Sequence, residues 1–281
     1  MAQTKHQIQA LLDEADAAPR QRFGQNFMID GNLVRIVADA GQIKSADLVI
    51  EVGPGTGTLT EELLATGATV LAVEIDKALS ELLRSRLAST ASFSLISGDA
   101  LAGKHELNAE LSAAVREAKQ AGKTVRLVAN LPYNIASPLV VELLIAGVDL
   151  LAFTVQKEVA DRLRAGPHSK EYGTFSIMVQ LLSRVEVIRT LPPQAFWPMP
   201  KISSALVRLT RDDRLGQRAM EFGKFVRRIF SARRKTLRNA LSLAGMDAGT
   251  LLDRLGINPQ SRAEDLTPED YVRLFENRVV N

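Results

Sequence analysis

The sequence predicts an α/β protein in which a mostly parallel sheet is followed by a small, all-helical domain. Short apolar runs alternate with helical patterns through the first two thirds of the chain. Such alternation is typical of parallel strands joined by helices on both faces of a sheet. From Leu215 onward only helical patterns remain, broken by glycine and proline. We therefore expect an N-terminal lead at residues 1–20, an α/β domain at 21–212 and a helical domain at 213–281.

The strands of the expected sheet are short and apolar, as in a sheet that is covered on both sides. We place them at residues 47–52, 69–73, 93–96, 125–129 and 150–155. Two further strands, 185–188 and 205–210, have no helix between them, so we expect an antiparallel hairpin at the edge of the sheet.

Two segments lie outside this regular alternation. Residues 103–122 are polar and rich in Ala, Glu and Lys, and we interpret them as an exposed helical insertion that is not part of the core. The N-terminal lead has no apolar signal region and contains Asp13, Glu14 and Asp16, which argues against an organelle transit peptide. It is expected to be a short amphipathic helix or a flexible lead.

The composition excludes several classes of protein. The chain has 281 residues, no cysteine and three scattered histidines, so disulfides and cysteine-based zinc sites are excluded and no metal is expected. No apolar run reaches the length of a membrane span, so we expect no membrane partner and a cytoplasmic location.

The charge of the chain is unevenly distributed. The formal net charge is only +3, yet residues 218–238 contain eight Lys and Arg against Glu221 alone. A concentrated basic segment suggests a polyanionic partner such as nucleic acid. The alternative for such a segment is a solvated helix face with no partner.

Polar residues and glycines follow three successive strands at the places where those strands end. Gly53, Gly55 and Gly57 come after the first strand, Glu74 after the second and Asp99 after the third. Glycines let a ligand approach the backbone at a helix N-terminus, and an acid in the second position can accept hydrogen bonds from a ribose diol. Alone, each feature is also compatible with a tight turn or a helix cap. Together they indicate an adenosine-containing ligand.

The fourth strand ends in Asn130-Leu131-Pro132-Tyr133, which precedes a helix that we expect from Ile135 to Ala146. An asparagine oxygen and the next backbone carbonyl can both accept hydrogen bonds from an amino group. Proline fixes the backbone between them, and the tyrosine ring can stack on a base. A strand-ending turn is the alternative interpretation of these four residues alone.

In this order, the features resemble the class I, Rossmann-like fold of S-adenosylmethionine-dependent methyltransferases. Several longer motifs narrow the resemblance to the ribosomal RNA adenine-N6 dimethyltransferase family, and within it to the bacterial small-subunit (16S) type. These motifs are RFGQNF at 22–27, QKEVA at 156–160, AGPHSKEYG at 165–173, FWPMPKISSA at 196–205 and RRKTLRN at 233–239.

The resemblance implies roles for particular residues. Domain 21–212 would be the methyltransferase catalytic domain, and domain 213–281 would bind rRNA. The catalytic group would be Asn130, Leu131, Pro132, Tyr133 and Phe196, with Phe196 stacked on the target adenine opposite Tyr133. S-adenosylmethionine would be held by Asn26, Met28, Gly53, Gly55, Gly57, Glu74, Ile75, Asp99, Ala100 and Asn130. RNA would be contacted by Arg227, Arg233, Arg234, Lys235, Arg238 and Lys201.

The resemblance also implies a substrate. It would be two adjacent adenines in the 3′-terminal hairpin loop of 16S rRNA, each methylated twice within an immature 30S subunit by a monomeric enzyme. A large-subunit rRNA methyltransferase of the resistance type would share the catalytic domain, but the basic cluster at 233–238 favours the small-subunit type. Leu131 disfavours DNA adenine and glutamine-amide methyltransferases, which usually carry a second proline there. A non-catalytic ribosome-assembly factor remains an alternative from another class.

Overall fold

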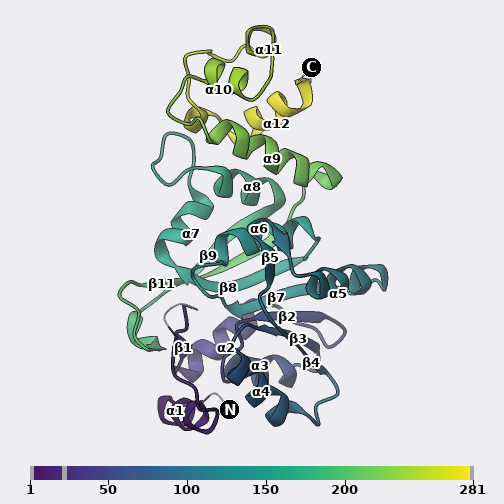
Figure 1. Cartoon of the computed structure of the whole chain (residues 1–281), viewed down its shortest axis with the longest axis vertical. Helices are drawn as coiled ribbons and strands as arrows, with labels where there is room; N and C mark the ends of the chain where they lie inside the picture. Colours follow the sequence, from purple (N-terminus) through teal and green to yellow (C-terminus); the bar gives the residue numbers. More distant parts are fainter. Residues whose placement is uncertain (1–2, 21–23, 279–281) are drawn as a thin grey trace. The chain divides into compact units, whose positions relative to one another are not determined.

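Figure 1 shows a computed structural model of the chain, which describes residues 3–20 and 24–278. Arg22 and Phe23, from the RFGQNF motif, lie outside the described residues. The chain divides into two compact units. The first comprises Met1–Ala160 and Val185–Arg211, and the second comprises Asp161–Arg184 and Asp212–Asn281. The second unit therefore includes residues 161–184, which we had expected to belong with the sheet.

The first unit is built on a seven-stranded sheet with the order β4-β3-β2-β7-β8-β11-β9. The first five of these strands run parallel to their neighbours, and β11 pairs antiparallel with β8. The predicted α/β fold is confirmed, and the last two strands lie at the sheet edge as expected. The bounds are β2 (Leu48–Val52), β3 (Thr69–Glu74), β4 (Phe93–Ser97), β7 (Val125–Asn130), β8 (Leu150–Gln156), β9 (Ser183–Leu191) and β11 (Ser204–Arg211).

Helices alternate with these strands along the chain. They are α1 (Lys5–Glu14), α2 (Gly31–Ala40), α3 (Thr58–Ala65), α4 (Lys77–Leu87), α5 (Ala109–Gln120) and α6 (Ala136–Ile145), and α7 (Lys157–Arg164) begins in the first unit and ends in the second. Two small two-stranded sheets complete the unit. They pair β1 (Phe27–Met28) with β10 (Phe196–Trp197), and β5 (Leu101–Gly103) with β6 (Glu106–Leu107).

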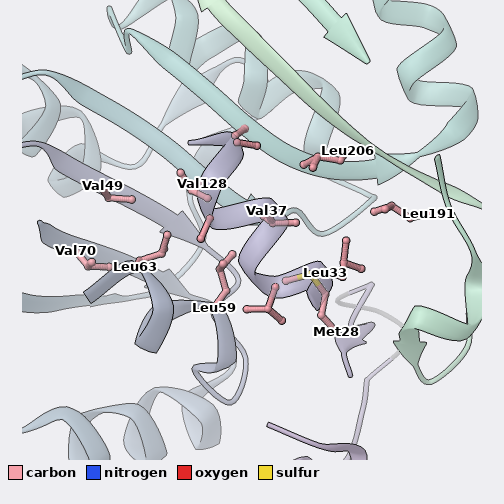
Figure 2. Close-up of a cluster of buried hydrophobic side chains, with 14 of the residues drawn as sticks. Met28, Leu33, Val37, Val49, Leu59, Leu63, Val70, Val128, Leu191 and Leu206 are labelled. Carbon is pink, nitrogen blue, oxygen red and sulfur yellow. The ribbon is translucent and has the colours of Figure 1, made fainter. Parts of the chain in front are cut away.

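The core of the first unit lies on both faces of the sheet. On one face, Val49, Val128 and Leu206 from three strands pack with Val37 of α2, as Figure 2 shows. Ile50 follows Val49 in the strand and therefore points to the other face, yet it is fully buried as well. Because both faces are covered, the central strands β2, β3, β7 and β8 are buried along nearly their whole length.

The interpretation of residues 103–122 as an exposed insertion is wrong. The segment does form a helix, but α5 buries Leu111, Val115 and Ala118 on one side. The spacing of these three residues places them on a single stripe of the helix. Since β4 and β7 both belong to the parallel part of the sheet, a crossover must join them, and α5 is part of that connection.

The N-terminal lead is helical. Thr4 and Gln7 form a capping box at the start of α1, in which the Gln7 backbone donates to Thr4 and the Thr4 backbone donates to Gln7. Ile8 and Leu12 are buried in a cluster with Leu79 of α4. Of the two alternatives for this segment, the amphipathic helix is therefore the one that the structure shows.

The second unit is helical apart from the start of β9. Its helices are α8 (Thr174–Leu182), α9 (Ala219–Phe230), α10 (Leu237–Leu243), α11 (Ala248–Leu255) and α12 (Pro268–Asn277). Phe222 packs edge-on against Phe275, and the Tyr172 hydroxyl donates to the Leu266 carbonyl at 2.8 Å. This bond ties the segment before α8 to the segment before α12, which explains why residues 161–184 group with the C-terminal helices.

None of the described helices combines the length and apolar character that crossing a membrane requires. The described residues contain no cluster of three or more His, Cys, Asp or Glu side chains that could hold a metal ion.

Candidate functional site

The carboxyl ends of four adjacent strands, β4, β3, β2 and β7, meet at one edge of the sheet. A cavity with about 900 Å³ of empty space, open solvent at its mouth included, lies there. The residues expected to hold the cofactor line it, with the exception of Gly57. They are Asn26, Met28, Gly53, Gly55, Glu74, Ile75, Asp99, Ala100 and Asn130.

The glycine-rich loop after β2 forms one wall of the cavity. Gly53 and Gly55 have φ angles of 74° and 60°, in the left-handed region that disfavours side chains. A Cβ atom on Gly55 would lie 2.8 Å from the ring of Phe27, and one on Gly53 would lie 3.1 Å from the ring of Pro132. Gly57 instead lies at the N-cap of α3, where a Cβ would meet Leu83 at 3.0 Å. Gly57 therefore shapes the turn and does not line the cavity.

Glu74, at the end of β3, is 2% exposed. Its carboxylate accepts hydrogen bonds from the Gly55 backbone N–H at 3.1 Å and from the Asp76 backbone N–H at 2.8 Å. Burial raises the pKa of Glu74 to about 7, although the two backbone donors oppose that rise. A buried carboxylate that lines a cavity is suited to accept hydrogen bonds from a diol, and the bond to Gly55 links the acid to the glycine loop.

Glu51 is a second buried acid of the cavity, and the sequence interpretation missed it. It lies within β2, is 1% exposed and accepts a hydrogen bond from the Thr60 hydroxyl at 2.6 Å. Burial raises the pKa of Glu51 to about 8, so the group is mostly neutral at pH 7. An acid inside an otherwise apolar parallel strand is the sequence signal that could have indicated it, because burying an acid costs free energy and such groups cluster at functional sites.

The residues after β4 and β3 also line the cavity. The Oδ1 atom of Asp99 accepts from the Leu101 backbone N–H at 3.0 Å, which leaves Oδ2 for a ligand. Ile75 is 40% exposed, although it is a large apolar residue. An exposed apolar side chain beside an acid matches what an aromatic base needs, namely a surface to pack on and an acceptor for its amino group.

Asn130, at the end of β7, is held in one orientation. Its Nδ2 atom donates to the backbone oxygen of Asn26 at 2.6 Å, and its Oδ1 atom accepts from the hydroxyl of Thr154. A flipped amide would place two oxygen acceptors against each other at Asn26. The contacts therefore fix which end of the amide is the oxygen, and Asn130 lines the cavity in that orientation.

The rest of the Asn130–Tyr133 segment surrounds this amide. Pro132 lines the cavity, whereas the side chain of Leu131 is buried at 1% exposure. Tyr133 is half-buried, and its hydroxyl is hydrogen-bonded to the Ser204 hydroxyl at 2.7 Å. Burial raises the pKa of Tyr133, so the phenol stays neutral at physiological pH.

The structure does not bring Phe196 to the cavity. Its ring is 2% exposed and belongs to the same hydrophobic cluster as Met28 and Leu33. Phe196 is also the cross-strand partner of Met28 in the β1–β10 pair. Because the ring fills the core here, stacking on a target base, as expected from the sequence, does not agree with this arrangement.

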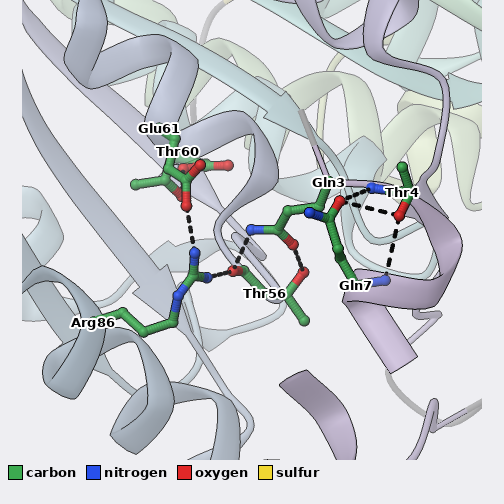
Figure 3. Close-up of polar contacts among 8 residues, drawn as sticks. Gln3, Thr4, Gln7, Thr56, Thr60, Glu61 and Arg86 are labelled. Carbon is green, nitrogen blue, oxygen red and sulfur yellow. Dashed lines mark hydrogen bonds and ion pairs between the residues drawn. The ribbon is translucent and has the colours of Figure 1, made fainter. Parts of the chain in front are cut away.

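The N-terminal segment is bonded to the glycine-rich loop, as Figure 3 shows. The Gln3 side chain donates to the backbone oxygen of Thr56 at 3.1 Å and accepts from the Thr56 hydroxyl at 2.7 Å. Arg86 of α4 donates to the same backbone oxygen and pairs with Glu61. Gln3 is 6% exposed and Thr56 is 1% exposed, so both of these hydrogen bonds are shielded from water. The N-terminal segment and α4 thus both bind the loop that forms the cavity wall.

The basic residues expected to contact RNA lie in both units. Arg227 is half-buried in α9, whereas Arg233, Arg234 and Lys235 are exposed in the turn between α9 and α10. Within the described part of the chain, no ion pair is found for these last three side chains. Arg238 is exposed on α10, and Lys201 is exposed in the loop between β10 and β11 of the first unit. Exposed cations without acidic partners are suited to contact phosphates.

Comparison with known proteins gives the family of the chain. A family model described as ribosomal RNA adenine dimethylase matches residues 17–278. The chain belongs to the ribosomal RNA adenine dimethylase family. The expected activity, S-adenosylmethionine-dependent methylation of adenine in ribosomal RNA, is confirmed at this level, together with the expected cofactor.

The relatives of this dimethylase cover nearly its whole length. A protein of Magnetococcus marinus named ribosomal RNA small subunit methyltransferase A is 40% identical over 95% of this chain and 94% of its own. A protein of the same name from Mycobacterium tuberculosis is 40% identical over 96% of this chain and 86% of its own.

Solved structures share the fold. A dimethyladenosine transferase from Plasmodium falciparum superimposes with a TM-score of 0.68 at 22% identity, covering 88% of this chain and 95% of that one. The 23S rRNA methyltransferase ErmE gives a TM-score of 0.60 at 24% identity, covering 89% of this chain and 98% of that one. At these identities the likeness shows the fold alone.

The residues of the cavity fit S-adenosylmethionine. Gly53 and Gly55 allow Pro132 and Phe27 to pack directly against the loop backbone at the cavity wall, where a Cβ would press on them, and Glu74 offers a carboxylate of the kind that binds a ribose diol. The hydroxyl of Thr58, which lines the cavity, has no hydrogen-bond partner among the described residues. A buried polar atom of this kind is expected to gain a partner when a ligand binds.

Proposed function

We propose that this dimethylase methylates N6 of two adjacent adenines in the 3′-terminal hairpin loop of 16S rRNA, twice each, in an immature 30S subunit. The names of its 40%-identical relatives support the small ribosomal subunit as the substrate. The observation that carries the proposal is the fixed amide of Asn130 at the cavity, since adenine N6 needs an acceptor there. We further propose that it acts as a monomer in the cytoplasm.

Bound S-adenosylmethionine would supply a methyl group already activated by its sulfonium. Glu74 would accept from the ribose hydroxyls, and Asp99 would accept from the adenine amino group while Ile75 packs on the ring. Gly53 and Gly55 would let the backbone approach the ligand. These residues bind and orient, so the reaction depends mainly on positioning.

The acceptor amine needs more than positioning, because the lone pair of adenine N6 is delocalised into the ring. The Asn130 oxygen and the Leu131 carbonyl would each accept one N6–H bond, which favours a tetrahedral nitrogen with an available lone pair. Pro132 restrains the backbone between these acceptors, and Tyr133 would stack on the base. The proton would leave to water after the positively charged product forms, so no side-chain base is required.

The RNA would be held by phosphate contacts. Arg233, Arg234 and Lys235 carry their charges on an exposed turn of the second unit, and Lys201 carries one on the first. A base in a loop is turned out at low cost, because fewer pairing and stacking interactions hold it.

The test uses the full-length protein, labelled S-adenosylmethionine and 30S particles isolated without this modification. We expect label on two adjacent adenines near the 3′ end of 16S rRNA. Absence of label on adenine would contradict the enzymatic proposal and favour an assembly factor, and label on 23S rRNA alone would favour the large-subunit type. Fully modified 30S particles are the control and should take up no label.

A further inference from the structure

Two buried hydroxyl groups lie next to the Asn130–Tyr133 segment, and the activity as proposed assigns neither a role. Thr154 of β8 and Ser204 of β11 are both 0% exposed. Each is hydrogen-bonded to a polar group of the segment: Thr154 to the Asn130 oxygen and Ser204 to the Tyr133 hydroxyl.

The register of the sheet explains why these contacts form. Thr154 is the cross-strand partner of Asn130 in the parallel β7–β8 pair, and in-register residues of neighbouring strands project from the same face. Ser204 stands one strand further along, opposite Gln156 at the same end of β8. The two hydroxyls are therefore fixed by strands of the rigid sheet, whereas the groups that they contact lie where β7 gives way to a loop.

The hydrogen bond from Thr154 uses one of the acceptor sites on the Asn130 oxygen. An amide oxygen has two lone pairs, and its N–H₂ group cannot accept. With Nδ2 bonded to Asn26 and one lone pair of Oδ1 bonded to Thr154, one lone pair remains at the cavity. The remaining acceptor matches the single N6–H bond that the proposed mechanism assigns to Asn130.

We propose that Thr154 and Ser204 are positioning residues for methyl transfer. Thr154 holds the acceptor oxygen of Asn130 in the direction of the target amine, and Ser204 holds the Tyr133 ring in its stacking position. This inference rests on the proposed function, since it assigns Asn130 and Tyr133 to the acceptor side of the reaction. In this way, the sheet behind the Asn130–Tyr133 segment determines the geometry of the acceptor side of the reaction.

Thr154→Val tests the first half of the inference. The substitution keeps the shape and the β-branch but removes the donor. We expect the single-turnover rate of methyl transfer to fall about ten-fold, equivalent to about 1.4 kcal/mol. The KM for 30S particles and the affinity for S-adenosylmethionine should stay within about two-fold of the wild type, because the lost contact acts on the reacting geometry. Thr154→Ser should restore most of the rate.

Thr210→Val is the matched control, because Thr210 lies at the far end of the same strand pair, opposite Leu150. It should leave the rate unchanged. If Thr154→Val does not fold, Thr154→Ala removes the same donor with less bulk, and the same rate loss is expected. A Thr154→Val enzyme with wild-type rate, or a Thr154→Ser enzyme as slow as the Val variant, would overturn the role of Thr154.

Ser204 is tested with a double-mutant cycle. Tyr133→Phe and Ser204→Ala remove opposite ends of one hydrogen bond, so their effects on the rate should not add in the double variant. Additive effects would overturn the role of Ser204. Inactivity of the wild-type enzyme on 30S particles would instead contradict the proposed function, so the two failures are distinguishable.

Discussion

The Nδ2 atom of Asn130 donates to the backbone oxygen of Asn26 at 2.6 Å, although the two residues are 104 positions apart in the sequence. The bond joins the segment before β1 to the end of β7, and both segments line the same cavity. It also determines which end of the Asn130 amide is the oxygen. The orientation of the proposed acceptor thus depends on a backbone atom of a distant segment.

The bond between Gln3 and Thr56 predicts that the N-terminal segment supports cofactor binding. Gln3→Ala removes both hydrogen bonds to the glycine-rich loop. We expect the affinity for S-adenosylmethionine to fall about five-fold, since a hydrogen bond contributes about 1 kcal/mol net. Isothermal titration calorimetry measures this. Gln9→Ala on α1, where no side-chain bond is found among the described residues, is the control; equal affinities for the two variants would contradict the prediction.

The buried acids predict a pH-dependent stability. Burial raises the pKa of Glu51 to about 8 and that of Glu74 to about 7, from the ordinary glutamate value of 4.5. Between pH 4.5 and the raised pKa of each acid, the folded state binds more protons than the unfolded state, so the free energy of unfolding falls as pH rises. Each group contributes at most about 1.4 kcal/mol per pH unit in its window.

Glu51→Gln isolates the contribution of one acid. Glutamine stays neutral and can still accept a hydrogen bond from Thr60. We expect urea denaturation of the ligand-free variant to show a shallower loss of stability between about pH 5 and about pH 8 than the wild type shows. Parallel curves for the two proteins would mean that Glu51 is not protonated in the folded state.

The exposed basic turn predicts salt-dependent RNA binding. Arg234→Glu combined with Lys235→Glu should weaken binding to 30S particles and reduce the slope of log affinity against log salt by about two, because two phosphate contacts are lost. Filter binding over a range of salt concentrations measures the slope. Charge reversal of Arg84 and Lys104, which are exposed in the first unit, gives a variant with the same net charge. Equal slopes for the two variants would contradict a role for the turn.

The burial of Phe196 predicts a structural role for this residue. Phe196→Ala should lower the free energy of unfolding by about 3–5 kcal/mol, as for other large core truncations. Phe196→Leu fills most of the volume and should retain methyl transfer. If the leucine variant is stable but inactive, the ring acts on the substrate as the family resemblance implies, and the β1–β10 pair must open during the reaction.

The cavity could be predicted from the sequence because parallel strands place their carboxyl ends together. Glycines, Glu74, Asp99 and Asn130 therefore had to meet if the strands were correctly assigned, and they do. Glu51 does not follow from this rule, because it lies within β2 and not at the end of the strand.

The other differences arise from packing that a single sequence does not specify. The apolar stripe of α5 consists of Leu111, Val115 and Ala118, which is too sparse to stand out among Ala, Glu and Lys. Residues 161–184 group with the C-terminal helices through long-range bonds such as that from Tyr172 to Leu266. The burial of the Phe196 side chain likewise depends on the pairing of two very short strands, β1 and β10.

The central claim is that the fixed amide of Asn130 activates adenine N6 of small-subunit RNA. Mass spectrometry of nucleosides from the 3′ fragment of 16S rRNA tests it most directly, with wild-type enzyme, Asn130→Ala and the surface control Asn32→Ala. We expect dimethyladenosine with the wild type and the control, and a rate lower by at least about 100-fold with Asn130→Ala, as for removal of other polar groups at reacting centres. Particle binding should remain. Full dimethylation by Asn130→Ala would contradict the account.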